Sequence, residues 1–226
     1  MKGLENLGAT CWLNALVQCL RACPLNLTKN ELFNALIITK ETDNTTDFLN
    51  NVMHKFGNVP SDAQEALVFL IDKFDLKDFV GEETQTVIYP TGKSVKKNEC
   101  TVWFHVNKSE VIQDYVDENG TKHNAAIIQR DLSKVPKVLV SDVVKDEMYG
   151  KKLIGIVCWG GGQWFTTGQW FTTGHYVAYV KDKGDPLDKS TDLDRDESLD
   201  CWYCANDEHI RKADAIPTSA RIAFYV

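Results

Sequence analysis

Apolar residues recur at helical spacing through the first third of the chain. The clearest stripe lies in residues 11–23, where apolar side chains occupy positions i, i+3, i+4 and i+7 before a proline ends the pattern. This stripe consists of Leu13, Leu16, Val17 and Leu20. Similar stripes near 29–39, at 46–56 and at 62–74, the last with Ser61 as candidate N-cap, predict further helices.

From about residue 84 onward the pattern changes to short runs rich in β-branched and aromatic residues, which are typical of strands. The runs cover 86–89, 100–106, 125–130, 137–140, 153–159, 175–181, 201–205 and 221–226. Turn-forming segments separate several of them, which favours antiparallel pairing. The expected fold class is α+β, with a helical lobe of about residues 1–80 packed against a mainly antiparallel β lobe of about 81–226 and a cleft between them.

One internal repeat interrupts this pattern. GQWFTTG at 162–168 is followed by GQWFTTG at 168–174, and the two copies share Gly168. Two copies of so short a unit cannot build a solenoid, so we interpret the segment as a duplicated loop. Its four large aromatic side chains would be costly to expose, so the loop either folds onto the protein or closes over a bound partner. The sequence leaves both alternatives open.

Composition and charge narrow the class of protein. Hydrophobic residues make up 43% and charged residues 25% of the 226 residues, as in ordinary globular proteins. The net charge of −7 disfavours a nucleic-acid partner, which needs basic side chains against phosphate. Residues 184–200 hold seven acidic side chains against two basic ones. Neither a signal peptide core nor an apolar run that could span a membrane occurs, so we expect no membrane partner.

The cysteine pattern points to free thiols. There are seven cysteines, an odd number in a chain of this length, which favours a reducing compartment such as the cytoplasm or nucleus. Cys11 is the best candidate nucleophile, because a helix N-terminus offers N–H donors and partial positive charge that favour a thiolate. Burial as small hydrophobic residues is the expected role of Cys19, Cys23, Cys100 and Cys158.

Metal binding is not expected from this sequence. Cys201 and Cys204 form a CxxC, but zinc needs two further ligands, and neither a second CxxC nor a histidine pair occurs. The acidic series at 192–196 resembles the start of a calcium loop, but Glu197 and Tyr203 stand where glycine and a bidentate glutamate are needed. We therefore expect neither a metal nor another cofactor.

A thiolate nucleophile needs a histidine as proton carrier and a third group to orient it. Five histidines are available. His175 is the mild favourite, because it follows Gly174 directly and opens a predicted strand, where a loop meets a rigid element. A structural or surface role is the expected one for His54, His105, His123 and His209.

Three segments together resemble a known family. GLENLGATCWLNALVQCL (3–20) resembles the cysteine box of the ubiquitin-specific proteases, which are papain-like cysteine deubiquitinases. GHYVAYVK (174–181), with WYCANDEHI (202–210), resembles the histidine box of that family. PSDAQEALVFLIDKF (60–74) is similar to the short acidic helix between the two boxes. The segments stand in the order of the family and span nearly the whole chain.

The resemblance assigns a role to each matched residue. It implies that Cys11 is the nucleophile and that His175 is the general base and later the general acid. Asn206 falls on the third position of the triad, with Asp207 beside it as an auxiliary. Asn6 matches the side chain that forms the oxyanion hole together with the Cys11 backbone N–H.

Further matches concern the substrate. The resemblance implies that Asp62 and Glu65 pair with arginines in the basic tail of ubiquitin, since charge-assisted carboxylate–guanidinium bonds are strong polar contacts. Without the resemblance, the two acids could simply complement the dipole of their own helix. The resemblance also assigns Gly174 and Tyr176, which flank His175, to substrate binding.

The resemblance thus implies a deubiquitinase that hydrolyses isopeptide or peptide bonds after the C-terminal glycine of ubiquitin. Residues 1–226 would form a single, monomeric catalytic domain that acts on ubiquitin or ubiquitinated proteins. Alternatives are a catalytically weak ubiquitin-binding module, a protease for another ubiquitin-like modifier, and a papain-like protease for ordinary peptides. Since Cys100 is the only cysteine between residues 24 and 157, the paired CxxC motifs of the finger region are missing. We therefore expect reduced or absent fingers and no structural zinc.

Overall fold

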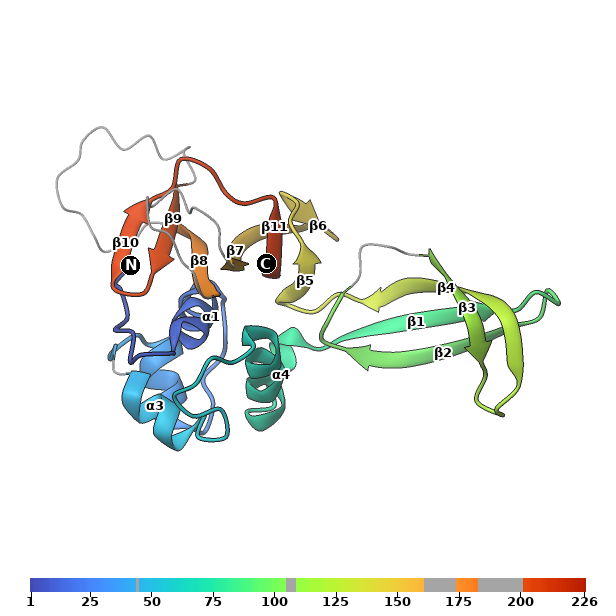
Figure 1. Cartoon of the computed structure of the whole chain (residues 1–226), viewed down its shortest axis with the longest axis horizontal. Helices are drawn as coiled ribbons and strands as arrows, with labels where there is room; N and C mark the ends of the chain where they lie inside the picture. The colour runs from blue at the N-terminus through green and yellow to red at the C-terminus, as the bar shows by residue number, and fades with distance from the viewer. Residues whose placement is uncertain (44, 105–108, 161–173, 183–200) are drawn as a thin grey trace.

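The structure is a computed structural model that describes residues 1–43, 45–104, 109–160, 174–182 and 201–226. The duplicated segment up to residue 173, His105 and the acidic stretch at 184–200 therefore lie outside the described residues. The remainder is an α+β protein whose helices precede its strands, as the hydrophobic pattern predicts (Figure 1).

The helical segment comprises α1 (Cys11–Ala22), α2 (Glu31–Phe33), the π-helix η1 (Asn34–Ile38), α3 (Thr45–Asn51), α4 (Ala63–Lys73) and the 3-10 helix η2 (Lys77–Phe79). Each predicted helix is present, although α3 is shorter than its apolar stripe. The N-cap of α4 is Asp62 and not Ser61, because the Asp62 carboxylate accepts hydrogen bonds from the Gln64 and Glu65 backbone N–H groups. Asp62 is thereby fixed at the start of α4.

The described strands form two sheets, and within each sheet every pair of neighbouring strands is antiparallel. The strands of the larger sheet run in the order β10-β9-β8-β7-β11-β5, with β6 paired to β7. Its members are β5 (Leu139–Val143), β6 (Glu147–Met148), β7 (Lys151–Gly160), β8 (His175–Asp182), β9 (Cys201–Asn206), β10 (His209–Lys212) and β11 (Ser219–Tyr225). The predicted runs at 153–159, 175–181, 201–205 and 221–226 all lie in this sheet.

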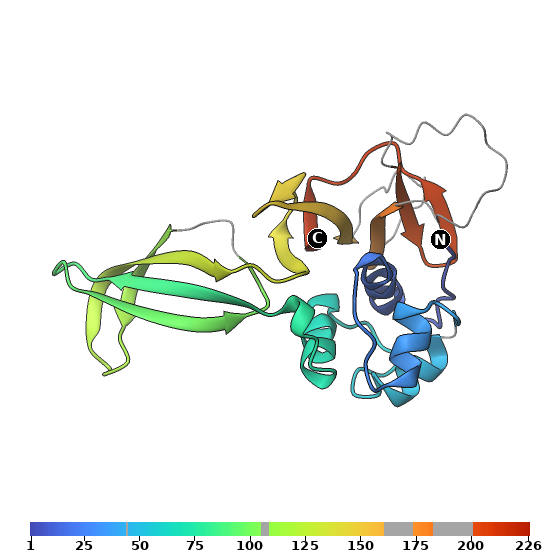
Figure 2. The same ribbon diagram turned by 180° about the vertical axis from the view of Figure 1, so that it is seen from behind.

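Helix α1 lies between the larger sheet and the other helices (Figures 1 and 2). Every residue from Trp12 to Leu20 is buried, including the polar residues Asn14 and Gln18. A helix that is buried on all sides is held by packing against its neighbours. Here α1 packs against β7 and β8 on one side and against α4 on the other. Cys11, the first residue of α1, is thus placed on a rigid element.

The second sheet projects away from the helices and the larger sheet (Figures 1 and 2). It has the order β2-β1-β4-β3 and comprises β1 (Gly81–Ile88), β2 (Ser94–Thr101), β3 (Ser109–Val116) and β4 (Lys122–Lys134). The missing CxxC motifs led us to expect a reduced or absent finger region. Strands β1 to β4 do form a projecting sheet, and what the sequence of this region lacks is the paired CxxC motifs.

The root of the projecting sheet is tightly packed. A Cβ atom at Gly81 would lie 2.6 Å from the Lys134 carbonyl oxygen and 2.7 Å from the Phe104 ring, so only glycine fits where these segments meet. Phe104 is 1% exposed and its backbone N–H donates to the Val140 carbonyl oxygen. Cys100, for which burial was expected, is instead exposed on β2.

The described part of the chain contains no helix that combines the length and the hydrophobicity needed to cross a bilayer.

Candidate active site

A cleft of about 460 Å³ opens between the helical segment and the larger sheet. The N-terminus of α1 and the start of α4 form one side of the cleft, and the ends of β7, β8 and β11 form the other. The residues that line the cleft include Cys11, Asp62, Trp159, Gly174, Tyr176 and Arg221. The predicted nucleophile therefore lines this cavity.

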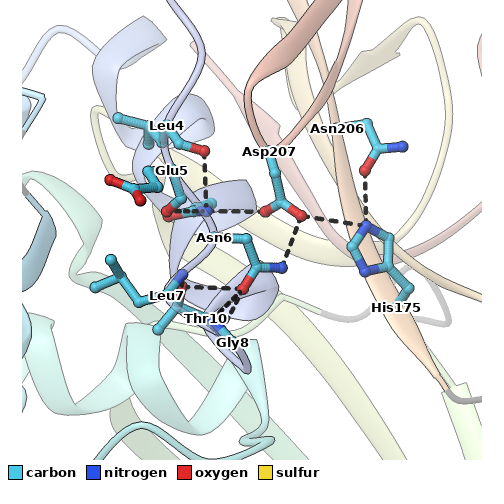
Figure 3. Close-up of polar contacts among 10 residues, drawn as sticks. Leu4, Glu5, Asn6, Leu7, Gly8, Thr10, His175, Asn206 and Asp207 are labelled. Carbon is cyan, nitrogen blue, oxygen red and sulfur yellow. Dashed lines mark hydrogen bonds and ion pairs between the residues drawn. The ribbon is translucent and has the colours of Figure 1, made fainter.

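The structure brings Cys11, His175 and Asn206 together from three different elements. His175, the first residue of β8, is 8% exposed, and its ring lies close enough to Cys11 for the thiol to contribute to raising the pKa of the imidazole. Its Nε2 lies 2.7 Å from Asn206 Oδ1 at the end of β9 (Figure 3). An amide oxygen only accepts hydrogen bonds, so Nε2 carries a proton and Nδ1 is left for the thiol.

The environment raises the pKa of His175 above its ordinary value. Burial alone would lower this pKa, because it disfavours the charged imidazolium. The hydrogen bonds to Cys11 and Asn206 outweigh burial, and the negative charges of Cys11 and Asp207 add to them. The imidazolium form is therefore favoured, as a thiolate–imidazolium pair requires.

Asp207 links the histidine to the N-terminal segment. Its Oδ2 lies 3.6 Å from His175 Nε2 and accepts a 2.8 Å hydrogen bond from Asn6 Nδ2 (Figure 3). The backbone also holds it, since Asp207 accepts a hydrogen bond from the Leu4 N–H through its carbonyl oxygen. Its φ of 51° places it in the left-handed region, which Asp tolerates better than most residues.

Asn6 is fixed at both ends of its side chain. Its Oδ1 accepts hydrogen bonds from the Gly8 and Thr10 backbone N–H groups, at 3.0 and 3.3 Å, so that Nδ2 must face Asp207. This arrangement orients the amide beside the N-terminus of α1, where Cys11 contributes a backbone N–H that has no partner within the helix.

Asn14 is a site residue that sequence reasoning missed. It is 2% exposed in α1, and its Nδ2 donates to Asp207 Oδ1 at 2.8 Å and to the Glu5 carbonyl oxygen at 3.1 Å. One Asp207 oxygen thus binds Asn6 and the other binds Asn14. The available signal was a polar residue one turn after Cys11, on the face of α1 that also carries Gln18.

The two acids at the start of α4 differ in their surroundings. Asp62 lines the cleft, but its Oδ2 already forms an ion pair with Nη2 of Arg221 on β11. The Glu65 side chain is 69% exposed, and Lys55 Nζ lies 3.9 Å from its Oε1. Arg221, which the sequence analysis did not single out, therefore stands beside the acid that the resemblance assigns to a substrate arginine.

Gly174 and Trp159 close one wall of the cleft. A Cβ atom at Gly174 would lie 2.5 Å from the indole ring of Trp159, so the glycine leaves room for that ring. Trp159 is 56% exposed, which is unusual for so large an apolar side chain. Tyr176 is 8% exposed and also lines the cleft.

Among the described residues, no group of three or more His, Cys, Asp or Glu side chains could hold a metal ion.

The fold and the site define an α+β protein in which a partly buried cysteine lies beside a buried histidine and asparagine at the head of a cleft. No protein-family model and no curated protein matches the chain. Solved structures do match it over its whole length. The SAGA Ubp8/Sgf11/Sus1/Sgf73 DUB module bound to ubiquitin aldehyde has a TM-score of 0.64 at 17% identity, covering 100% of this chain and 69% of that chain.

Two further structures of this module give the same result. One is the Ubp8-Sgf11-Sgf73-Sus1 SAGA DUB module, with a TM-score of 0.62 at 18% identity and coverage of 100% and 67%. The other is the yeast SAGA DUB module with a mutant Sgf73, with a TM-score of 0.65 at 16% identity and coverage of 100% and 68%. The chain thus has the ubiquitin-specific protease fold of the Ubp8 DUB module.

Proposed function

We propose that this protein is a cysteine-type deubiquitinase that hydrolyses the bond after the C-terminal glycine of ubiquitin. The observation that carries the proposal is that Cys11 lies beside His175 at the cleft while the His175 ring is hydrogen-bonded to Asn206. The fold adds support, because the structures that match the chain are deubiquitinase modules and one is bound to ubiquitin aldehyde. Residues 1–226 would act as one monomeric catalytic domain in a reducing compartment.

In the acylation step, Cys11 Sγ attacks the carbonyl carbon of the terminal glycine. The electron pair of that carbonyl moves onto its oxygen, which the Cys11 backbone N–H and Asn6 Nδ2 stabilise. Nδ2 has two N–H groups, and one of them donates to Asp207, so the second remains for the oxyanion. The C–N bond then breaks as His175 protonates the leaving lysine amine, and a thioester on Cys11 remains.

In the deacylation step, neutral His175 takes a proton from water, and the resulting hydroxide attacks the thioester carbonyl. The C–S bond breaks, ubiquitin leaves with a free carboxyl group, and the Cys11–His175 pair is restored. Asn206 holds the ring in one orientation through both steps, because its bond to Nε2 makes Nδ1 the nitrogen that exchanges the proton.

Turnover of a ubiquitin–fluorophore amide tests this function. Wild-type protein should release the fluorophore with saturation kinetics, and Cys11→Ala should release none. Cys100→Ser is the matched control, because Cys100 is an exposed thiol on β2, far in the sequence from the site. It should keep wild-type kcat/KM. Equal turnover by wild type and Cys11→Ala would reject the proposal.

A ubiquitin-binding module of low activity is the second candidate. The Asp62–Arg221 ion pair bears on its low activity, because the acid that the resemblance assigns to a ubiquitin arginine already has a partner and would hold the tail less firmly beside Cys11. This candidate predicts that Cys11→Ala binds ubiquitin in calorimetry while wild type turns over the fluorogenic substrate only marginally. If the tail of another ubiquitin-like modifier is cleaved faster than the tail of ubiquitin, that modifier is the preferred substrate.

A further inference from the structure

Among the described residues that line the cleft, Asp62 is the acidic residue and Arg221 is the basic one. They come from the start of α4 and from β11, and they are 159 positions apart in the chain. Both are accessible from the cleft, since 34% of the Asp62 side chain and 46% of the Arg221 side chain are exposed. The ion pair therefore forms part of the surface that an incoming peptide meets.

The Asp62 carboxylate has no oxygen left unused. Oδ1 accepts hydrogen bonds from the Gln64 and Glu65 N–H groups at 2.8 and 3.2 Å, and Oδ2 accepts from Arg221 Nη2. Burial raises the Asp62 pKa, but these hydrogen bonds outweigh burial and lower it, so the carboxylate stays charged at neutral pH. A substrate cation that approaches Oδ2 therefore meets the guanidinium of Arg221, which already donates to that oxygen.

We propose that Arg221 is a specificity-determining residue that competes with substrate for Asp62, so that the cleft gives no preference to a peptide tail with a cation at this position. The inference rests on the proposed function, because it concerns the tail that leads to Cys11. When a substrate guanidinium replaces that of Arg221 at Asp62, the number of charge-assisted hydrogen bonds stays the same. A basic tail therefore gains no binding affinity over a neutral one. Removal of Arg221 would free Asp62 for such a tail.

The first experiment compares two tails on the inactive Cys11→Ala protein. Binding of ubiquitin and of ubiquitin whose tail arginines are replaced by leucine is measured with and without Arg221→Gln. We expect Arg221→Gln to raise the ratio of the two affinities about tenfold in favour of the basic tail, the size of one charge-assisted hydrogen bond. Arg221→Lys is the matched control and should keep the original ratio, because it keeps the charge beside Asp62.

The second experiment needs no ubiquitin. Modification rates of Cys11 by a cationic and an anionic methanethiosulfonate reagent are measured in the Cys100→Ser background by peptide mass spectrometry. Arg221→Gln should raise the cation-to-anion rate ratio several-fold, and adding Asp62→Asn should return it to the starting value. This result is expected if the two charges neutralise one another in the cleft.

The outcomes separate the two proposals. If neither form of ubiquitin binds while the reagent ratio changes as expected, the proposed function fails and the pairing of Arg221 with Asp62 stands. If Arg221→Gln weakens both forms of ubiquitin equally, Arg221 binds the substrate itself and the competition is refuted. An unchanged affinity ratio together with an unchanged reagent ratio likewise overturns the inference.

Discussion

Asn6 and Asp207 lie 201 positions apart in the chain, and Asn6 Nδ2 donates a 2.8 Å hydrogen bond to Asp207 Oδ2. This bond connects the segment before α1 to the turn between β9 and β10. It also orients the amide that we propose for the oxyanion hole. Asp207 holds Asn14 in the same way through its other oxygen, so one carboxylate positions two amides beside Cys11.

Asp207→Asn tests this relationship. An amide offers one acceptor oxygen in place of two, so either Asn6 or Asn14 loses its acceptor. We expect kcat to fall about tenfold with little change in KM, less than the 10²–10³-fold loss that removal of an oxyanion donor typically causes. Glu208→Gln, at the exposed neighbouring position, is the control and should be silent. Wild-type kcat in Asp207→Asn would show that the carboxylate does not position the amide.

Asn206→Ala should change the pH dependence of activity. The hydrogen bond to Asn206 raises the pKa of His175, so its removal lowers that pKa. The imidazolium then loses its proton at lower pH, and the alkaline limb of the kcat/KM profile moves to lower pH. The loss in kcat should stay below the roughly 10²–10⁴-fold that general acid–base catalysis contributes. An alkaline limb that stays in place contradicts the assignment.

His175 should also contribute to stability in a pH-dependent way. Its pKa is raised in the folded protein, so its stabilising effect is complete below the unfolded value of about 6.5. The effect is lost as the pH rises through the folded value. The difference in free energy of unfolding between wild type and His175→Gln should therefore shrink with rising pH in urea titrations. A difference that grows with pH would have the wrong sign.

Gly174→Ala should distort the cleft through Trp159. The new Cβ would lie 2.5 Å from the indole ring, so the ring must move. We expect a higher KM for the ubiquitin substrate and little change in the free energy of unfolding, because Trp159 is 56% exposed. Trp159→Ala removes the obstructing ring, so KM in the double variant should equal that of Trp159→Ala alone. A further rise in KM in the double variant would show that Gly174 acts independently of Trp159.

Leu16→Ala tests the packing of α1. Leu16 is fully buried, and truncation of a buried leucine costs about 2–5 kcal/mol of unfolding free energy. Val68→Ala on α4 is the control, because Val68 is 44% exposed and should cost less than about 0.5 kcal/mol. Similar losses in the two variants, measured by urea unfolding, would contradict the packing described for α1.

The helices could be predicted because each has an apolar stripe with clear ends, as α1 does before Pro24. The projecting sheet could be predicted only in part. Strand β2 reads SVKKNECT and β3 reads SEVIQDYV, and most of their side chains are exposed, so neither presents the alternation of a half-buried strand. The apolar residues Trp103 and Phe104 lie beyond β2, at the root of the sheet.

The candidate site could be predicted where local sequence carries the chemistry. Cys11 and His175 each begin a regular element, and Asn206 ends one. Asn14 and Arg221 could not be predicted in this way, because their roles depend on contacts between distant segments. Asp207 reaches Asn14 across 193 positions, and Arg221 reaches Asp62 across 159.

The central claim is that Cys11 is the nucleophile for a ubiquitin tail. Ubiquitin with an electrophilic C-terminus, incubated with wild-type protein, tests it by intact mass and by peptide mapping. We predict one ubiquitin per chain, attached to Cys11, with no adduct on Cys11→Ala and unchanged labelling of Cys100→Ser. An adduct on any other cysteine, or one that persists in Cys11→Ala, would contradict the account.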